Sequence, residues 1–198
     1  MKLATWNVNG IRARQTHLQE FIEREQPDLL CLQELKASPD QLPVWLGDLD
    51  GDWCYWHGGK DFAAKMQFLE ALDAYAAESQ AAGLPLILCG DLNVARTDMD
   101  VHPKERKPRA IGQLPEERAL VERLLGRGLV DVHRQLDPDN PNLFTWWAPW
   151  RDLKQRNIGW RLDYVLASQA LAARATSCVV QREVGTSDHG PVVAIFNL

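Results

Sequence analysis

Apolar residues in this chain gather in short runs that end in polar side chains. The clearest run, Leu86 to Cys89, leads directly into Gly90, Asp91 and Asn93. An unbroken apolar run of this length predicts a fully buried strand. Residues two apart on an extended backbone face the same way, so Asp91 and Asn93 are expected side by side at the strand end. The same two residues also suit a turn, and the pattern alone leaves both interpretations open.

Two segments near the N-terminus repeat this arrangement. Lys2 to Trp6 predicts a short strand that ends at a turn beginning with Asn7, and residues 28–34 predict a second buried strand that ends in Glu34. Glu34 could simply be exposed or pair with a nearby lysine. Two acids at strand ends in one short chain nevertheless favour convergence on a shared site.

Helices are predicted where apolar residues recur every three or four positions. The first carries Leu18 and Phe21 and stops before a proline at position 27. The second begins at Phe62 and closes at Gly83, and the third runs from Pro115 to the glycines at 126 and 128. Between the first two helices the pattern is weaker, with a short helix expected near 41–46 and a strand at 53–56.

The last third of the chain is predicted to be mostly strand. The expected strands are Leu143–Trp147, Arg161–Leu166, Thr176–Arg182 and Val192–Phe196. Asp163 lies in the second of them, close to the apolar interior. The loop before the last strand places Asp188 next to His189, between small turn residues. An isolated histidine is usually structural, but this arrangement often presents a catalytic pair.

Composition limits the class of protein. A chain of 198 residues with 45% hydrophobic and 25% charged residues suits one globular domain. No run is long and apolar enough to span a membrane, no signal sequence precedes the first strand, and the cytoplasm is the expected location. The four cysteines form no CxxC pair, so they are interpreted as reduced core residues and not as zinc ligands.

Charge argues against nonspecific attraction to nucleic acid. The formal net charge is −5, so any DNA contact must rely on a local basic segment. One candidate is the cluster Lys104, Arg106, Lys107 and Arg109, which a solvated loop would also explain. Four of the eight tryptophans fall within fifteen residues, as part of the core or as a surface on which bases stack.

Five sequence blocks, spread from one end of the chain to the other, resemble the exonuclease III type of apurinic/apyrimidinic endonuclease, within the endonuclease/exonuclease/phosphatase superfamily. The blocks are Trp6-Asn7-Val8-Asn9-Gly10-Ile11-Arg12-Ala13, Leu32-Gln33-Glu34-Leu35-Lys36, Gly90-Asp91-Leu92-Asn93-Val94-Ala95, Gly159-Trp160-Arg161-Leu162-Asp163-Tyr164 and Ser187-Asp188-His189-Gly190-Pro191. The second and fourth blocks resemble the DNA-repair branch more than the phosphoinositide phosphatases or sphingomyelinases.

This resemblance implies an α/β fold of the DNase I-like kind, a four-layer α-β-β-α sandwich. It implies a Mg²⁺ site, with Mn²⁺ possible, held by Glu34 with Asn7 nearby and served by Asp188. The partner would be double-stranded DNA with abasic sites or 3′ ends, with no membrane and no obligate protein partner.

The resemblance also implies catalytic roles. Asp91 would be the base for the attacking water, Asn93 would orient that water and contact the phosphate, and His189, held by Asp163, would stabilise charge in the transition state. The expected substrate-binding residues form the pocket for an extruded abasic sugar: Trp146, Trp160, Arg161 and Leu162. The expected reactions are hydrolysis of DNA 5′ to abasic sites and removal of 3′ nucleotides.

One departure from the family pattern stands out. Family members continue from a His-Gly-x-Lys segment, here residues 57–60, into several strands and a Tyr-x-Pro-x-Gly loop before the next helix. In this chain Lys60 runs almost straight into that helix, and Tyr55, Tyr75 and Tyr164 all lack the loop context. We therefore expect a single domain over residues 1–198, internally truncated near 60–61, with its first sheet shortened and the active-site tyrosine missing.

Two alternatives compete with a DNA-repair nuclease. The first is another phosphoesterase of the same superfamily that acts on a small phosphate or a lipid head group; the tryptophan-rich stretch and the basic loop with Arg109 argue against it. The second is a catalytically impaired remnant that binds DNA or nothing, which the missing tyrosine block favours.

Overall fold

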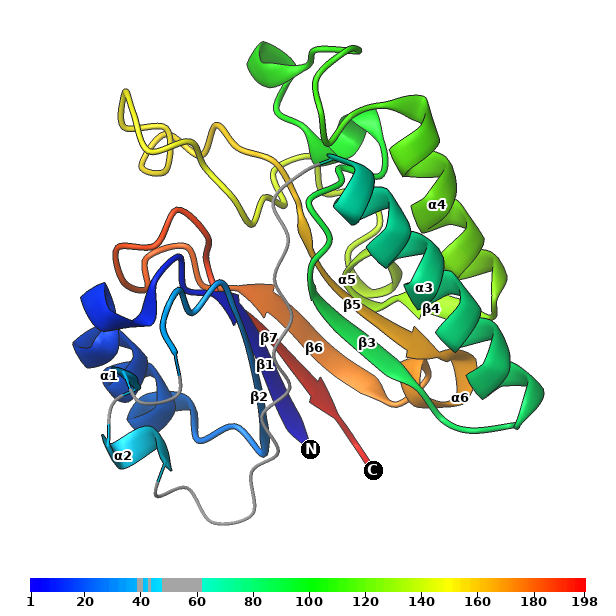
Figure 1. Ribbon diagram of the computed structural model, residues 1–198, viewed down its shortest axis with the longest axis horizontal. Coiled ribbons are helices and arrows are strands. Elements are labelled where there is room, and N and C mark those ends of the chain that lie inside the picture. The colour runs from blue at the N-terminus through cyan, green and yellow to red at the C-terminus, as the bar shows by residue number, and fades with distance from the viewer. Residues whose placement is uncertain (39–40, 43, 48–61) are drawn as a thin grey trace.

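Seven strands in two sheets form the centre of the molecule. The computed structural model describes residues 1–38, 41–42, 44–47 and 62–198 (Figure 1). The strands are β1 (Lys2–Asn7), β2 (Leu29–Gln33), β3 (Ile87–Asp91), β4 (Leu129–Asp131), β5 (Asp163–Ser168), β6 (Ala175–Val180) and β7 (Val192–Phe196). One sheet has the order β2-β1-β7-β6 and the other the order β3-β5-β4.

Helices cover the outer face of each sheet. They are α1 (Gln15–Glu25), α2 (Val44–Gly47), α3 (Phe62–Ala81), α4 (Pro115–Gly126), α5 (Val132–Leu136) and α6 (Gln169–Ala172). Figure 1 shows α1 and α2 beyond the four-stranded sheet and α3 and α4 beyond the three-stranded sheet. The four-layer sandwich expected from the resemblance is confirmed. In the described part of the chain, no helix combines the length and the hydropathy needed to cross a membrane.

The two-residue period of the strands separates an inner and an outer apolar layer. On β5, Val165 and Ala167 face the other sheet, whereas Tyr164 and Leu166 pack under α3 and α4. On β1, Leu3 faces inward and Trp6 packs against Phe21 of α1, with ring centroids 5.6 Å apart. We call the alternate residues of a strand that face the other sheet its inner row. The inner rows of β1, β3 and β5 lead to the same end of the sandwich.

The strand positions expected from sequence are largely confirmed, but two expected environments are wrong. β2 and β3 were both expected to be fully buried, and each lies at the edge of its sheet with most of its residues half-exposed. Leu29, at the start of β2, is 49% exposed. In this protein, an unbroken apolar run therefore corresponds to an edge strand. Both faces of that strand are packed, because one faces the other sheet and the other faces a helix.

Two further expectations concern the segments between the main elements. Residues 143–147 form no regular strand; only Trp146 makes isolated bridges, to Trp160 and His189. Aromatic β-propensity was overridden there by turns on both sides. The short helix expected near 41–46 corresponds to α2, and the strand expected at 53–56 lies outside the described residues.

Candidate active site

Three inner rows of the sandwich change from apolar to polar at one end. The row of β1 runs from Leu3 through Thr5 to Asn7, and the row of β3 ends at Asp91. Asp163 begins β5 and lies directly opposite Asp91 in the antiparallel pair β3–β5. Asn7 and Asp163 are almost completely buried. The strands thus deliver an amide and two carboxylates to one point, as convergence of strand ends predicts.

Asp91 and Asn93 do lie side by side, although not on an extended backbone. Asn93 adopts a left-handed conformation, with φ of 54°. Its backbone N–H and its side-chain Nδ2 donate to the Asp91 carboxylate at 2.8 and 2.9 Å. From sequence, Asp91 and Asn93 suited either a turn or a pair of polar groups at a strand end. In the structure they form both at once. Burial raises the pKa of Asp91 to about 6, while the charge of His189 acts in the opposite direction.

Asn7 connects the two sheets at this point. Its Nδ2 donates to Asp91 Oδ2 at 2.9 Å and to Glu34 Oε1 at 3.2 Å. Its amide oxygen accepts from the backbone N–H of Asn9 at 3.0 Å. In this arrangement Asn7 presents its N–H groups to the two acids and links Glu34 to Asp91, beside the place where the resemblance implies a metal.

His189 is fixed by Asp163. Its Nδ1 lies 2.9 Å from Asp163 Oδ2, and its Nε2 lies 3.8 Å from Asp91 Oδ2. Burial opposes protonation of the ring, but the carboxylates of Asp163, Asp91 and Asp188 outweigh burial and raise the pKa of His189 to about 9. The imidazole is therefore a cation at neutral pH, placed between two acids.

The backbone around His189 is tied to β1. Ser187 Oγ donates to the carbonyl of Asn7 at 2.7 Å and accepts from the N–H of His189 at 3.2 Å. Trp6 Nε1 donates to the carbonyl of His189 at 3.3 Å. Sequence reasoning missed Ser187 as a positioning residue, because its partner lies 180 residues away in the chain. Only the small residues around the Asp-His pair suggested that the loop is tightly held.

Asp188 faces the same site from the other side of the loop. Asn9 Nδ2 donates to its Oδ1 at 2.8 Å, and Trp146 Nε1 donates to its Oδ2 at 3.0 Å. Burial opposes ionisation, yet the charge of His189 and these two hydrogen bonds outweigh it, so the pKa of Asp188 is lowered. Asp188 therefore stays ionised while it links the Asn9 turn to the tryptophan pair.

Glu34 is the most exposed of the acids at this site. Lys36 Nζ lies 2.8 Å from Glu34 Oε2 and also contacts the side-chain oxygen of Asn9. Burial opposes ionisation of Glu34, but the hydrogen bonds from Lys36 and Asn7 lower its pKa. A cationic ammonium group thus sits between a carboxylate and an amide oxygen, the ligand types that hard divalent cations prefer. From sequence, Lys36 was expected only as a possible partner of Glu34.

A second group of potential ligands is Asp91, Asp163 and His189, whose candidate atoms lie within 4.8 Å of one another. A histidine must be neutral to ligate a metal. Because the pKa of His189 is raised, its ring is better suited to neutralise the two acids than to bind an ion. Glu34, by contrast, is exposed, and its carboxylate is open to a cation from solvent.

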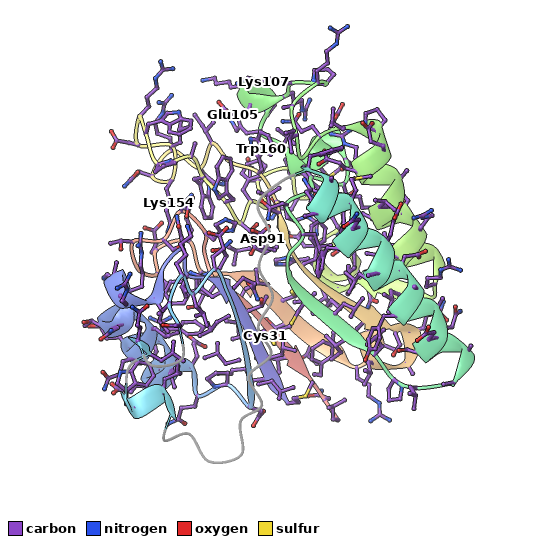
Figure 2. All side chains as sticks on the ribbon, in the orientation of Figure 1. Cys31, Asp91, Glu105, Lys107, Lys154 and Trp160 are labelled. Carbon is purple, nitrogen blue, oxygen red and sulfur yellow. The ribbon has the colours of Figure 1, made fainter. Side chains whose placement is uncertain are left out.

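Three of the residues expected to bind the substrate lie together. Trp146 and Trp160 are half-buried and pack edge to face, with ring centroids 5.5 Å apart. Leu162 lies beneath them in a small apolar cluster with Ala95 and Val101. Gly159 is required here, because a Cβ would lie 2.4 Å from the carbonyl oxygen of Trp146. Figure 2 shows Trp160 and Asp91 towards the same end of the molecule.

The expected substrate contact by Arg161 is wrong. Its side chain has no solvent exposure. Its guanidinium donates to Asp100 Oδ1 at 2.7 Å and to Asp131 Oδ1 at 3.0 Å, and it stacks on Tyr164 at 4.4 Å from the ring centroid. Arg134 makes a second ion pair with Asp100 at 2.8 Å. Arg161 therefore holds the start of β5 and cannot reach a ligand.

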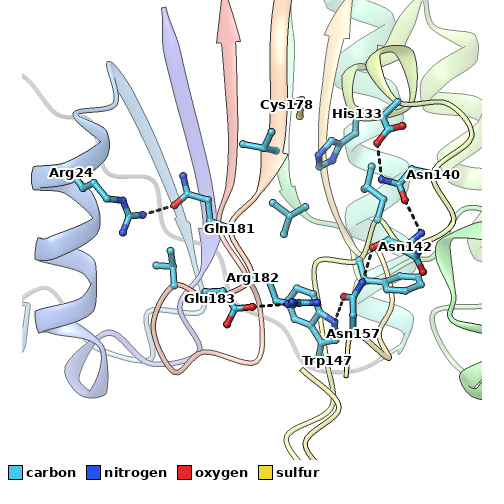
Figure 3. A pocket seen from close by; sticks show the side chains of 16 residues that line it. Arg24, His133, Asn140, Asn142, Trp147, Asn157, Cys178, Gln181, Arg182 and Glu183 are labelled. Carbon is cyan, nitrogen blue, oxygen red and sulfur yellow. Dashed lines mark hydrogen bonds and ion pairs between the residues drawn. The ribbon is translucent and has the colours of Figure 1, made fainter. Parts of the chain in front are cut away.

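Two other features lie around the site. The basic residues at 104, 106, 107 and 109 are all exposed, in the 3-10 helix Pro103–Glu105 and the loop that follows it. A separate groove of about 630 Å³ lies beside β6, between Arg24 and His133 (Figure 3). No residue predicted for the site lines this groove, so it is distinct from the cluster at the strand ends.

Comparisons with known proteins agree with this geometry. The model of the endonuclease/exonuclease/phosphatase family matches residues 4–189. The exodeoxyribonuclease of Bacillus subtilis (strain 168) is 30% identical over 254 aligned positions, covering all of both chains. The DNA repair nuclease APEX1 of Danio rerio is 29% identical, covering 97% of this chain and 81% of that protein. Recombination repair protein 1 of Drosophila melanogaster is 28% identical, and the chain spans 37% of its length.

Solved structures give the same result. A 3′-5′ exonuclease from Neisseria meningitidis has a TM-score of 0.89 and 28% identity, with all of both chains covered. A Neisseria 3′ phosphatase bound to a product DNA hairpin has a TM-score of 0.89 and 27% identity, again with full coverage.

Proposed function

Because this chain belongs to the endonuclease/exonuclease/phosphatase family, we propose that it is a Mg²⁺-dependent DNA-repair nuclease. Its reactions are hydrolysis of the phosphodiester 5′ to an abasic site and removal of nucleotides from 3′ ends. The observation that carries the proposal is the buried group of Asp91, Asn7, Asp163 and His189, in which a carboxylate with a raised pKa lies 3.8 Å from a cationic imidazole.

Asp91 is the proposed general base. A base works best when its pKa is close to the working pH, and the pKa of Asp91 of about 6 meets that condition while leaving the group mostly ionised at pH 7. Asn7 and Asn93 hold its oxygens through three N–H groups. Asp91 accepts a proton from the attacking water, and Asn93, which is exposed, orients that water and contacts the phosphate.

His189 is the proposed electrostatic stabiliser. Hydrolysis of a phosphodiester adds negative charge to the non-bridging oxygens in the transition state, and a fixed cation there lowers the barrier. Asp163 holds the ring through Nδ1, which leaves Nε2 to face the reacting phosphate. Because the ring cannot rotate away from Asp163, this cation needs little reorganisation during the reaction.

The divalent cation would be held by Glu34, with Asp188 serving its hydrogen-bond network. Four carboxylates, those of Glu34, Asp91, Asp163 and Asp188, face three cationic side chains among the described residues: Lys36, His189 and, through its charge on Asp188, Lys154. The unbalanced negative charge supports an ion of charge +2. A bound Mg²⁺ supplies Lewis-acid polarisation of the phosphate and keeps several of its own waters.

DNA is the proposed substrate because of the surroundings of this group. Trp146, Trp160 and Leu162 offer an apolar site for a sugar that lacks its base, which costs less to extrude than a paired nucleotide. The exposed basic residues 104–109 lie near Trp160 in Figure 2. There they would contact the phosphates of the DNA backbone. The DNA-bound Neisseria neighbour supports a DNA substrate.

We also propose that the chain is one domain with an internal block missing near residues 60–61. The alignments to relatives run over 252 to 255 positions, whereas the chain has 198 residues. Loss of the tyrosine in that block removes a hydroxyl that would contact the phosphate. Deleting a single transition-state donor costs roughly 10²–10³-fold in rate, so we expect a slow enzyme.

The test is a panel of substrates given to the full chain and to Asp91→Asn, in Mg²⁺. The panel holds a duplex with one abasic analogue, a duplex with a recessed 3′ end, a duplex with a 3′ phosphate, and an inositol phosphate. Cleavage of DNA that is lost in Asp91→Asn supports the proposal. Hydrolysis of the inositol phosphate alone would favour another phosphoesterase. No hydrolysis by a chain that circular dichroism shows to be folded would favour an impaired remnant.

A further inference from the structure

Lys65 of α3 contacts the backbone of Asn93, at the edge of the candidate active site. Its Nζ donates to the Asn93 carbonyl oxygen at 2.8 Å. Figure 1 shows that α3 begins at the end of the sandwich where β3 finishes, which places the two residues close together. The side chain of Lys65 is only 15% exposed, so it is not an ordinary solvated surface cation.

A buried acid holds the ammonium group of Lys65 in place. Lys65 Nζ forms an ion pair with Glu117 Oε1. Glu117 lies in the first turn of α4 and has no solvent exposure. Its other oxygen accepts from the backbone N–H groups of Gly112 and Leu114, at 2.6 and 3.0 Å. Because removing one partner of a buried ion pair leaves an uncompensated charge, the ammonium group has little freedom to move away.

Gly112 packs against the same carbonyl group. A Cβ at this position would lie 3.1 Å from the Asn93 carbonyl oxygen and 3.1 Å from the ring of Trp160. The Gly112 carbonyl accepts from the backbone N–H of Ala95 at 2.8 Å. The chain that follows β3 is therefore held at Asn93 by Lys65 and, two residues later, by Gly112.

Asn93 needs this support because its backbone is left-handed, with φ of 54°. Residues other than glycine adopt that conformation at a cost in energy, so the surrounding contacts must maintain it. In this conformation both the backbone N–H and the side-chain Nδ2 of Asn93 reach Asp91. The orientation of the Asn93 carbonyl is set by its ψ angle, so a contact that fixes this carbonyl also fixes the residue that faces Asp91.

We propose that Lys65, anchored by Glu117, is a positioning residue that holds the left-handed backbone of Asn93 and so directs its two N–H groups at Asp91. The consequence for catalysis rests on the proposed function, whereas the consequence for Asp91 does not. Loss of Lys65 should lower kcat at least about tenfold and change KM for DNA less than about twofold, because a small displacement at a reacting group mainly affects the transition state.

The test variant is the double substitution Lys65→Met, Glu117→Gln. Lys65→Met alone would leave a buried carboxylate without its partner and would destabilise the chain. Glu117→Gln keeps an oxygen for the backbone N–H groups of Gly112 and Leu114. Because the double substitution removes one positive and one negative charge, the net charge near the site does not change.

A matched control is available on the same two helices. Arg127, at the C-terminal end of α4, donates from Nε and Nη2 to the two carboxylate oxygens of Asp73 of α3, both at 2.9 Å. The control variant, Arg127→Met, Asp73→Asn, also removes an ion pair between α3 and α4 without a change in net charge. It reports the effect of weaker helix packing alone.

The first measurement is the titration of the Asp91 carboxyl group by carbon-13 NMR, in the full chain without DNA. Burial raises the pKa of Asp91 to about 6, and the backbone hydrogen bond from Asn93 is one of the contacts that lower it. The other groups that face Asp91 are His189, Asp163 and Asn7, and the test variant retains all three. We expect a higher Asp91 pKa in the test variant and the wild-type value in the control variant.

The second measurement is steady-state incision of an abasic duplex in Mg²⁺ as a function of pH. In the test variant, kcat should fall at least about tenfold with KM almost unchanged. The acidic limb of its pH profile should move to higher pH, because the proposed base then has a higher pKa. The control variant should keep the wild-type kcat and profile.

Three results would overturn the proposal. The first is an Asp91 titration that is the same in the test variant and the wild type. The second is an equal change in the test and control variants, which would mean that Lys65 only joins two helices. The third is a higher KM with an unchanged kcat, which would make Lys65 a DNA contact. A wild-type chain that cleaves no substrate would refute the nuclease proposal, and the Asp91 titration would still decide the role of Lys65.

Discussion

Two polar clusters lie within the sandwich, and they differ in charge balance. Around Arg161, two guanidinium groups, those of Arg161 and Arg134, meet two carboxylates, those of Asp100 and Asp131. The pKa of Asp100 is lowered to about 2, because the two arginines outweigh its burial. Around Asp91, by contrast, burial raises the pKa of the carboxylate to about 6.

The difference separates a structural cluster from a functional one. In a balanced, hydrogen-bonded cluster, the partners favour the charged form of each member. Each charge then adds to the free energy of unfolding as long as its partners are in place. In the unbalanced cluster, burial favours the neutral form of Asp91, so keeping this acid ionised costs stability. Perturbed acids of the second kind are typical of active sites. Substitutions in the two clusters should therefore have opposite effects on stability.

The largest effect is expected from Asp91→Asn. Removing a general base costs about 10²–10⁴-fold in rate, and the asparagine cannot accept the proton. A carboxyl group whose folded pKa is raised loses stability as pH rises through that value, so the neutral amide should raise the unfolding free energy at pH 7 by about 1–2 kcal/mol. The measurements are incision of an abasic duplex and urea unfolding. A variant that is both inactive and less stable would contradict the distinction between the clusters.

Asp100→Asn should lower the free energy of unfolding, the opposite of the change expected for Asp91→Asn. Breaking a buried ion pair leaves uncompensated charge and costs about 3–5 kcal/mol. Unfolding in urea should show this loss, with Asp98→Asn as the control, because the Asp98 pair with Arg118 is largely exposed and should change stability by less than about 1 kcal/mol. Equal losses in the two variants would contradict a structural role for the Arg161 cluster.

A pH-dependent loss of stability is expected from His133, beside the Arg161 cluster. Burial, followed by the charge of Arg161, lowers the pKa of His133 to about 4. The unfolded chain, with a pKa near 6.5, therefore takes up a proton first as pH falls, and stability is lost between about pH 6.5 and 4.

The check is the difference in unfolding free energy between wild type and His133→Gln at pH 7 and at pH 5. That difference should shrink by about 2 kcal/mol at the lower pH. Comparing the two proteins cancels the opposite contribution of Asp91, which favours folding as pH falls. A difference that does not change with pH would mean that His133 is not held neutral.

The smallest effect is expected from Lys107→Ala, on the exposed basic loop. Removing one cation that binds a backbone phosphate should weaken DNA binding a few-fold, about equally for all sequences, and lower the slope of log K against log salt by about 1. Binding of the abasic duplex at several salt concentrations measures this, with Lys2→Ala as the control, because Lys2 is tied to Glu25 at the opposite strand end. An unchanged slope would exclude the loop from the DNA interface.

Much of the fold follows from local pattern. The helices at 15–25, 62–81 and 115–126 and the strands at β1, β5, β6 and β7 were expected, because their apolar residues repeat with the period of one structure. The environments of β2 and β3 were not, since a run such as Leu86–Cys89 does not reveal whether it has two neighbours or one.

The site was predictable where a strand end carries a polar residue. Asp91, Asp163 and His189 do converge, with their candidate atoms within 4.8 Å of one another. Arg161 was misplaced because its partners, Asp100 and Asp131, come from loops and strand ends far apart in the chain.

The most direct test of the unbalanced cluster as a metal-dependent active site is incision of an abasic duplex as a function of Mg²⁺ concentration. Three proteins are compared: wild type, Glu34→Gln and Asp91→Asn. We predict no incision in EDTA, a Mg²⁺ midpoint at least about tenfold higher in Glu34→Gln with activity recovered at high Mg²⁺, and a loss in Asp91→Asn that no Mg²⁺ concentration restores. Incision in EDTA, or an unchanged Mg²⁺ midpoint in Glu34→Gln, would contradict the account.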